Sequence, residues 1–280
     1  MPNYIIRMPF STTFVLLQQE AFLACGSLST GLTSLRAAEF PDTEKFYSGF
    51  FNVSIALERI LKLVLVVDHM SKHSFRAPTK HELKAYGHDI CTLYRMGVAL
   101  AQTHGVRGFY WPEDGSIELR MLEFFSEFAR KSRYYNLDAL VTLPGQYTEP
   151  LGVWDAILKD VLANDVPRKR IAARMVQAKA VHDILANSMH AVQHGMNGEL
   201  LSLREVFAAP ARHQLAVPYA MVRLFRILLP ILELADLTAR RAYSLNHREV
   251  KGTQHIPLLH EFFNRFKASD AQIRRKKRWP

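Results

Sequence analysis

The chain has 280 residues, of which 49% are hydrophobic and 22% charged, and its formal net charge is +10. This composition is typical of a globular protein, and with only two cysteines it excludes a disulfide scaffold, a collagen-like chain and a disordered chain. Residues 1–140 contain 15 basic and 14 acidic residues, whereas residues 141–280 contain 21 and 12. A positive field concentrated in one half suits a polyanionic partner, and the alternative is that the charge serves solubility.

Apolar residues recur at three- and four-residue spacing along the first half, which predicts amphipathic helices. The expected helices span residues 11–36, 43–69, 79–103 and 116–137. Thr79 and Glu82 have the spacing of a capping box at the start of the third helix. The loop before the fourth helix contains Phe109, Tyr110 and Trp111, which favours a satellite cluster under the helices over a binding lip.

The string LPGQYTEPLG at residues 143–152 has the strongest concentration of proline and glycine, and it predicts a domain boundary. Beyond it, helices are expected over the ranges 151–163, 167–194, 200–208 and 217–245, with one or two more after Pro257. Pro230 is expected to bend the long helix, and the final IRRKKRWP to form a basic tail. We therefore predict an all-α fold, with a four-helix up-down bundle at residues 8–142 and a basic helical extension at 150–280.

The N-terminal residues lack the continuous apolar stretch of a signal peptide. The apolar run at 60–67 is too short to cross a bilayer, and the segment 221–237 carries four charged residues. We therefore expect a cytoplasmic protein that makes no membrane contact, with Cys25 and Cys91 as free thiols.

The common motifs of nucleophilic catalysis, dinucleotide binding and phosphate-loop binding do not occur in the sequence. His190 and His194 have the spacing of two metal ligands on one helical face, but no third ligand is visible. Solvated or capping histidines are the favoured interpretation, so we predict neither a metal site nor a cofactor.

Glu58 and Lys62 interrupt a strongly apolar helix and are four residues apart, the spacing of a helical ion pair. Gly87 is expected inside a helix, where glycine costs about 1 kcal/mol relative to alanine. A close helix crossing at Gly87, with His88 hydrogen-bonded across the bundle, is the favoured explanation, and a catalytic or ligand-binding His88 is the alternative.

Three strings in the first half resemble segments of the HEPN superfamily of prokaryotic four-helix domains. They are ALERILK (56–62), KAYGHDI (84–90) and ARKSRYYNLDAL (129–140). The resemblance covers about residues 10–140 and implies a helical bundle that dimerises. Many HEPN proteins cleave or process RNA without a metal, while others are non-catalytic partners. In the nucleases, an arginine followed after four to six residues by a histidine supplies phosphate stabilisation and proton transfer.

Four arginine–histidine pairs in the chain have this spacing: Arg76 with His81, Arg240 and Arg241 with His247, and Arg248 with His255. The composition produces about as many pairs by chance, so position has to discriminate between them. Arg241 and His247 occur at an expected helix end and are the preferred catalytic candidates, although they lie outside the part that resembles the family.

Several further residues are candidates for binding. Arg133, Tyr134 and Tyr135 could stack on or clamp a nucleotide, and the alternative is that the tyrosines pack against a helix end. Arg168, Arg170 and Arg174 are expected near a helix start, where backbone amides also favour phosphate.

The sequence therefore predicts a HEPN-like, dimeric protein that binds RNA or a nucleotide. Whether it also cleaves RNA, as a metal-independent endoribonuclease of a defence or toxin system, is left open by the sequence. The alternative is a non-catalytic helical scaffold for interaction or dimerisation. In the first hypothesis, the basic second half holds the RNA or other polyanion.

Overall fold

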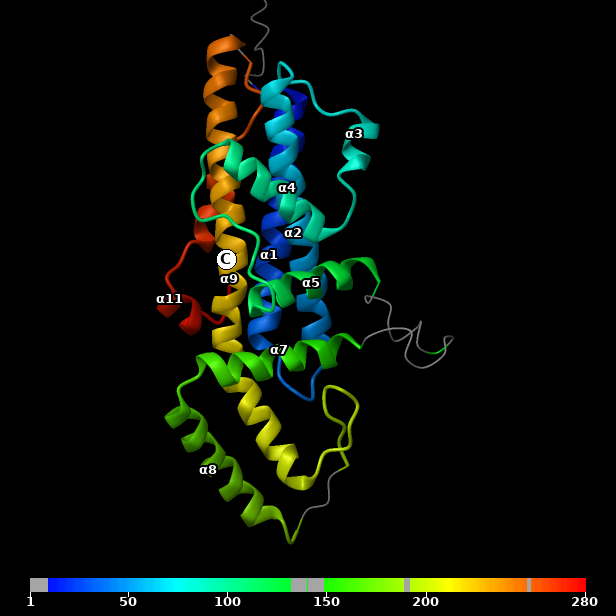
Figure 1. Cartoon of the computed structure of the whole chain (residues 1–280), viewed down its shortest axis with the longest axis vertical. Helices are drawn as coiled ribbons and strands as arrows, with labels where there is room; N and C mark the ends of the chain where they lie inside the picture. Colours follow the sequence, from blue (N-terminus) through cyan, green and yellow to red (C-terminus); the bar gives the residue numbers. More distant parts are fainter. Residues whose placement is uncertain (1–9, 132–139, 141–148, 189–191, 251–252) are drawn as a thin grey trace, which may run out of the picture. The chain divides into compact units, whose positions relative to one another are not determined.

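The computed structural model describes residues 10–131, 140, 149–188, 192–250 and 253–280 (Figure 1). These residues form helices joined by loops, and no strand occurs among them. Two isolated bridges, between Phe10 and Gln254 and between His194 and Leu200, are the extended pairings in this part of the chain. The all-α prediction is therefore confirmed.

The helices follow the predicted order with shifted ends. Their bounds are α1 (Thr12–Ala37), α2 (Glu44–Lys72), α3 (Lys80–Ala85), α4 (Ile90–Thr103), α5 (Ile117–Arg130), α7 (Pro150–Asp165), α8 (Arg168–Leu185), α9 (Leu203–Glu249), α10 (His260–Phe263), η2 (Asn264–Phe266) and α11 (Asp270–Arg275).

The predicted helix 79–103 is wrong in one respect, because it is two helices. The capping box of Thr79 and Glu82 starts α3 as expected, but the helix ends at Ala85. Gly87 has a φ of +69°, in the left-handed region that glycine adopts at low cost. Asp89 then caps α4 by accepting a hydrogen bond from the Thr92 backbone amide at 2.6 Å. A Cβ at Gly87 would meet no atom within 4 Å, so the glycine provides a turn and no close helix crossing.

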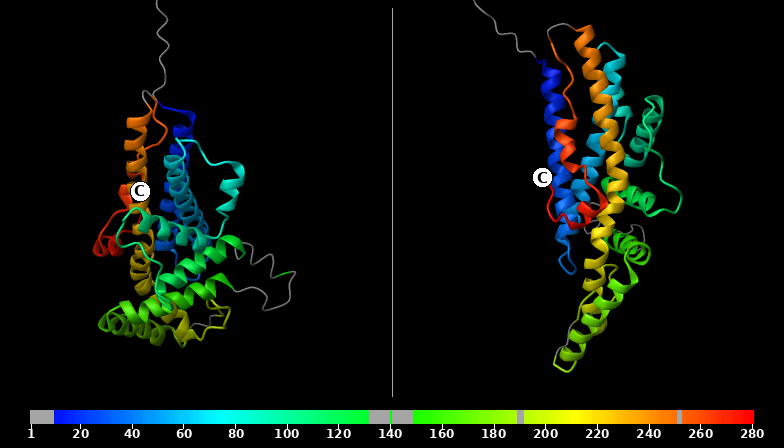
Figure 2. Two further views of the ribbon diagram at one scale, coloured as in Figure 1. Left: turned by 45° about the horizontal axis from the view of Figure 1, so that its top comes forward. Right: turned by 90° about the vertical axis from the view of Figure 1, so that its left-hand side faces the viewer.

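The two helices predicted at 200–208 and 217–245 are one helix, α9, of 47 residues. Figure 2 shows it, coloured from yellow to orange, as one continuous ribbon that includes Pro210, Pro218 and Pro230. An interior proline costs about 3 kcal/mol. Burial of apolar side chains along α9 offsets this cost. Phe225 and Leu228, for example, are each 1% exposed or less.

Length and composition would allow Leu203–Arg248 to cross a membrane, and it is the one such helix in the part of the chain that the structure describes. Within its most apolar window, 61% of the residues are buried inside the protein. Core helices of soluble proteins have the same properties.

The chain divides into two compact units, which are described separately. Unit 1 comprises Met1–Leu28, Ile55–Trp111 and Leu228–Lys267, and unit 2 comprises Ser29–Ser54, Pro112–Ile227 and Ala268–Pro280. Both units take residues from each side of the boundary expected at 143–152, because α1, α2 and α9 each contribute to both. The change in net charge between the two halves of the sequence therefore does not coincide with the division into units.

The aromatic loop belongs to unit 1, where Phe109 is 1% exposed. Its ring meets the buried ring of Tyr94 edge-on at 4.8 Å between centroids. Trp111 lies under the guanidinium of Arg95 at 4.0 Å, while Tyr110 is exposed. The interpretation of this loop as a satellite cluster is thus favoured for two of its three aromatic residues.

In unit 2, an aromatic cluster joins α2, α5 and α7. Phe50 meets the rings of Phe124, Phe128 and Trp154 at centroid distances of 4.6, 5.5 and 5.3 Å. Ser54 donates to the backbone carbonyl of Phe125 at 3.1 Å, which satisfies its buried hydroxyl. All four rings are buried, so this cluster forms part of the unit 2 core.

The C-terminal residues are folded into unit 2 and do not form the expected tail. Ser269 and Gln272 form a capping box that starts α11, and Ile273 is fully buried. Trp279 stacks on Phe225 at 4.6 Å, and its backbone amide donates to Thr33 Oγ1 at 3.0 Å. Two buried apolar side chains therefore anchor a segment whose charge alone suggested a solvated chain end.

Candidate functional site

Four arginines line one cavity of about 420 Å³ in unit 2, which we call the four-arginine pocket. Arg36 comes from α1, Arg170 from α8, and Arg274 and Arg275 from α11. The remaining lining residues are Gln214, Leu215, Pro218, Tyr219 and Ala271. No carboxylate lines the cavity among the described residues, so the pocket has a strong positive potential.

Tyr219 organises two of these arginines. Arg170 Nη1 donates to the Tyr219 hydroxyl at 3.2 Å. The guanidinium of Arg274 lies 5.5 Å from the centroid of the Tyr219 ring, within cation–π range. One aromatic residue therefore holds two cations close together through different parts of its side chain.

Arg36 is half-buried, and burial lowers the pKa of its guanidinium below the ordinary value. Its Nε atom is buried and has no hydrogen-bond partner in the described part of the chain. A buried N–H donor without an acceptor is unfavourable, and a bound anion would satisfy it.

The three arginines predicted near a helix start lie on the first turns of α8, as expected. Arg170 lines the four-arginine pocket, whereas Arg168 is exposed and does not line it. Arg174 donates through Nη2 to Gln214 Oε1 at 2.7 Å, and Gln214 is a lining residue. The structure therefore brings two of the three to the pocket or its edge.

A second basic cavity, of about 400 Å³, lies in unit 1 and contains the predicted catalytic arginine. It is lined by Ser71, Arg240, Arg241, Ala242, Ser244, Leu245 and Arg248. Arg240 is paired with Asp236 at 2.5 Å. His247 is exposed and does not line this cavity. His247 follows Arg241 by six positions along α9, which places the two side chains about 120° apart around the helix axis.

His88 forms a surface network in unit 1. Its Nδ1 lies 2.9 Å from Glu58 Oε1, and Lys62 Nζ donates to the same oxygen at 2.8 Å. The predicted pairing of Glu58 with Lys62 is confirmed, but the His88 side chain is 80% exposed and does not lie in a sealed core. The turn at Gly87 is the reason, because it carries His88 outside both flanking helices. Arg133, Tyr134 and Tyr135 lie outside the described residues.

The sequence interpretation missed the Asp68–His104 pair. His104 Nε2 lies 2.9 Å from Asp68 Oδ1, and Lys72 donates to Asp68 Oδ2 at 2.7 Å. The spacing of Asp68 and Lys72 indicates a helical ion pair, but no local pattern predicts the histidine, which comes from the end of α4.

The sequence interpretation also missed the roles of Arg36 and Tyr219, since neither belongs to a basic run. The spacing of Ser269 and Gln272 could have predicted α11, and with it an ordered position for Arg274 and Arg275.

Among the described residues, no group of three or more histidine, cysteine, aspartate or glutamate side chains could hold a metal ion. His190 lies outside these residues. In comparisons with known proteins, the chain matches no family model, no curated protein and no solved structure.

Proposed function

We propose that the protein binds RNA through the four-arginine pocket. The observation that carries this proposal is that four arginines from three helices line one cavity, with no carboxylate in its described lining. Bringing like charges together is unfavourable, and phosphate groups would relieve the repulsion while releasing counterions. Because Tyr219 already orients Arg170 and Arg274, little side-chain ordering is needed on binding.

The proposal includes the HEPN-like fold, with residues 8–142 as a four-helix up-down bundle, a homodimer and a cytoplasmic location. The three strings in the first half support the resemblance. Helices α1, α2, α4 and α5 also lie within residues 10–140, the part of the chain that the resemblance covers.

If the protein cleaves RNA by HEPN chemistry, Arg241 would stabilise the phosphate and His247 would transfer the proton. The two side chains point about 120° apart around α9, so they would have to act on one phosphate from different copies of the chain. Cleavage by this pair therefore depends on the proposed homodimer.

The second candidate function is a non-catalytic scaffold for interaction or dimerisation, and α8 favours it. No described residue of α8 is buried. Val176 and Ile184 are 69% and 77% exposed, so the helix presents apolar side chains that a partner could cover.

The experiment that tests the proposal uses the purified full chain and a fluorescent single-stranded RNA in EDTA at low salt. Fluorescence anisotropy measures binding, and a denaturing gel measures cleavage. We expect binding whose affinity falls steeply as salt is raised. A complete absence of binding at low salt would overturn the proposal and favour the scaffold.

Arg241→Ala/His247→Ala is the matched variant for cleavage. If cleavage occurs without metal, we expect the double variant to lose it while it still binds RNA. Cleavage that persists unchanged in the variant would contradict the assignment of these two residues.

A further inference from the structure

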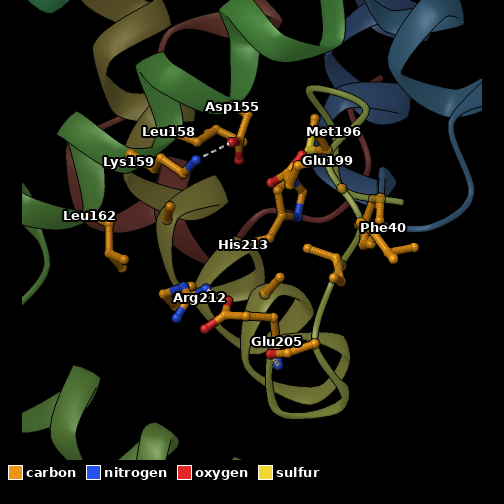
Figure 3. Close-up of a pocket in the computed structure, with 16 residues that line it drawn as sticks. Phe40, Asp155, Leu158, Lys159, Leu162, Met196, Glu199, Glu205, Arg212 and His213 are labelled. Atoms are coloured by element: carbon orange, nitrogen blue, oxygen red, sulfur yellow. Dashed lines mark hydrogen bonds and ion pairs between the residues drawn. The ribbon is translucent and has the colours of Figure 1, made fainter. Parts of the chain in front are cut away.

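A separate cavity of about 420 Å³ in unit 2, which we call the His213 pocket, lies between α7, the N-terminal half of α9 and the loop before α9. Its volume is within the range of small-molecule sites, about 300–1,000 Å³. Figure 3 shows its lining. Apolar side chains that line it include Leu158, Leu162, Met196, Leu201 and Ala209.

His213 is the unusual residue of this wall. It is 6% exposed, and neither ring nitrogen has a hydrogen-bond partner in the described part of the chain. Its ring meets Phe46 edge-on at 5.1 Å between centroids, which fixes its position. Burial lowers its pKa to about 4, although the charge of Asp155 acts in the opposite direction. The imidazole is therefore neutral at pH 7, with one N–H donor and one lone pair unused.

The charged residues of the wall leave a surplus of negative charge. Asp155 is paired with Lys159 at 2.6 Å, and Glu205 is paired with Arg212. The third carboxylate of the lining, Glu199, has no cation within ion-pair distance among the residues that the structure describes.

Glu199 is held in place by the loop that carries it. Its backbone carbonyl accepts a hydrogen bond from the Gly195 amide at 2.7 Å. A Cβ added at Gly195 would lie 2.3 Å from the Glu199 carboxylate, so this glycine leaves the space that the carboxylate occupies. Burial and the charge of Glu199 together raise the pKa of nearby Glu149. Negative charge is thus concentrated at this end of unit 2.

We propose that the His213 pocket binds a small primary amine with an apolar body. The ammonium group would donate hydrogen bonds to the Glu199 carboxylate and to the free lone pair of His213, and the body would lie against the leucines and Met196. An ammonium group has donors and no acceptor, so it matches both groups, whereas an anionic ligand would be repelled by Glu199. This inference is independent of RNA binding, because it uses none of the residues of the four-arginine pocket.

The test uses the full chain labelled at histidine Cε1 with carbon-13 and two probe pairs of equal shape and opposite charge. Phenethylamine is compared with 3-phenylpropionate, and tryptamine with indole-3-propionate. The resonance of His213 is assigned as the one missing in His213→Phe. We expect the two amines to shift it in a saturable manner and the two carboxylates to leave it unchanged.

Glu199→Gln is the variant that separates binding from folding, since Glu199 lies on an exposed loop. Loss of a charge-assisted hydrogen bond should weaken the amines about tenfold. Glu113→Gln, at an exposed glutamate that does not line the pocket, is the control and should leave the affinity unchanged. The proposal is overturned if the amines cause no saturable shift, if the carboxylates bind equally well, or if Glu199→Gln binds the amines as tightly as the unmodified chain does.

Discussion

Arg170 Nη1 donates to the hydroxyl of Tyr219 at 3.2 Å and so connects α8 to α9 at the edge of the four-arginine pocket. The same tyrosine ring lies 5.5 Å from the Arg274 guanidinium. The orientation and the charge of these arginines can therefore be changed separately, because Tyr219 contributes to orientation alone.

Tyr219→Phe removes the acceptor of Arg170 and keeps the ring that faces Arg274. We expect the affinity for single-stranded RNA to fall about fivefold, the value of a hydrogen bond of about 1 kcal/mol. The slope of log affinity against log salt should stay the same, since no charge is lost. Fluorescence anisotropy over a salt series measures both quantities. Tyr110→Phe, at an exposed tyrosine, is the control, and a flatter slope in Tyr219→Phe would contradict the proposed role.

His213 makes stability depend on pH in a defined direction. Its pKa is about 4 in the folded chain and near the ordinary 6.5 in the unfolded chain. Between these two values the unfolded chain binds a proton that the folded chain does not. The free energy of unfolding should therefore fall as the pH falls from 6.5 to 4, by roughly 3 kcal/mol, and show no further change from this residue below 4.

The measurement is urea unfolding of the unmodified chain and of His213→Phe from pH 4 to pH 8. The difference between the two stability curves isolates the histidine. This difference in the free energy of unfolding should be constant above pH 6.5. Below pH 6.5 the unmodified chain should lose stability that His213→Phe keeps. Parallel curves over the whole range would show that His213 titrates normally in the folded chain.

Two glycines of α1 should respond to alanine in opposite ways. Gly26 has open space around the position of a Cβ, so Gly26→Ala should raise stability by about 0.5–1 kcal/mol through helix propensity. At Gly31 a Cβ would lie 2.7 Å from both the Cγ2 and the backbone nitrogen of Val53. Gly31→Ala should lower stability by about 1–3 kcal/mol, because the backbone of α2 would have to move. Thermal unfolding of the two variants measures these changes. Equal shifts in Tm would contradict the close approach of Gly31 to Val53.

The sequence predicted the ends of α1 and α2 to within three residues, because each helix has a long apolar stripe and clear flanking signals. The sequence-based prediction was wrong where a local pattern is compatible with more than one structure. Gly87 was interpreted as a close crossing inside a helix, whereas it forms a turn, after which Asp89 caps a new helix. The sequence placed a gap between helices at 209–216, which contains Pro210, but α9 is one helix there, because burial along it outweighs the cost of the proline.

The candidate site was predictable only in part. The basic run at the start of α8 indicated a polyanion site, and Arg170 does line the four-arginine pocket. Arg36 could not be assigned to it, because the residue is isolated in sequence and reaches the pocket through tertiary structure. The C-terminal arginines were recognised as basic but not as ordered, since the anchoring role of Trp279 depends on a contact with Phe225.

The most direct test of the central claim compares two triple variants that each remove three positive charges. Arg170→Gln/Arg274→Gln/Arg275→Gln changes the four-arginine pocket, and Arg76→Gln/Arg107→Gln/Arg204→Gln changes three exposed arginines elsewhere.

The measurement is the affinity of both triple variants for single-stranded RNA over a salt series. With about 0.7 counterions released per phosphate contact, the pocket variant should bind about 100-fold more weakly near 0.1 M salt, and its slope should fall by about 2. The control variant should keep the slope and lose less than about threefold in affinity. Equal losses in the two variants would contradict the account, because they would show that RNA responds to the net charge of the chain and not to this pocket.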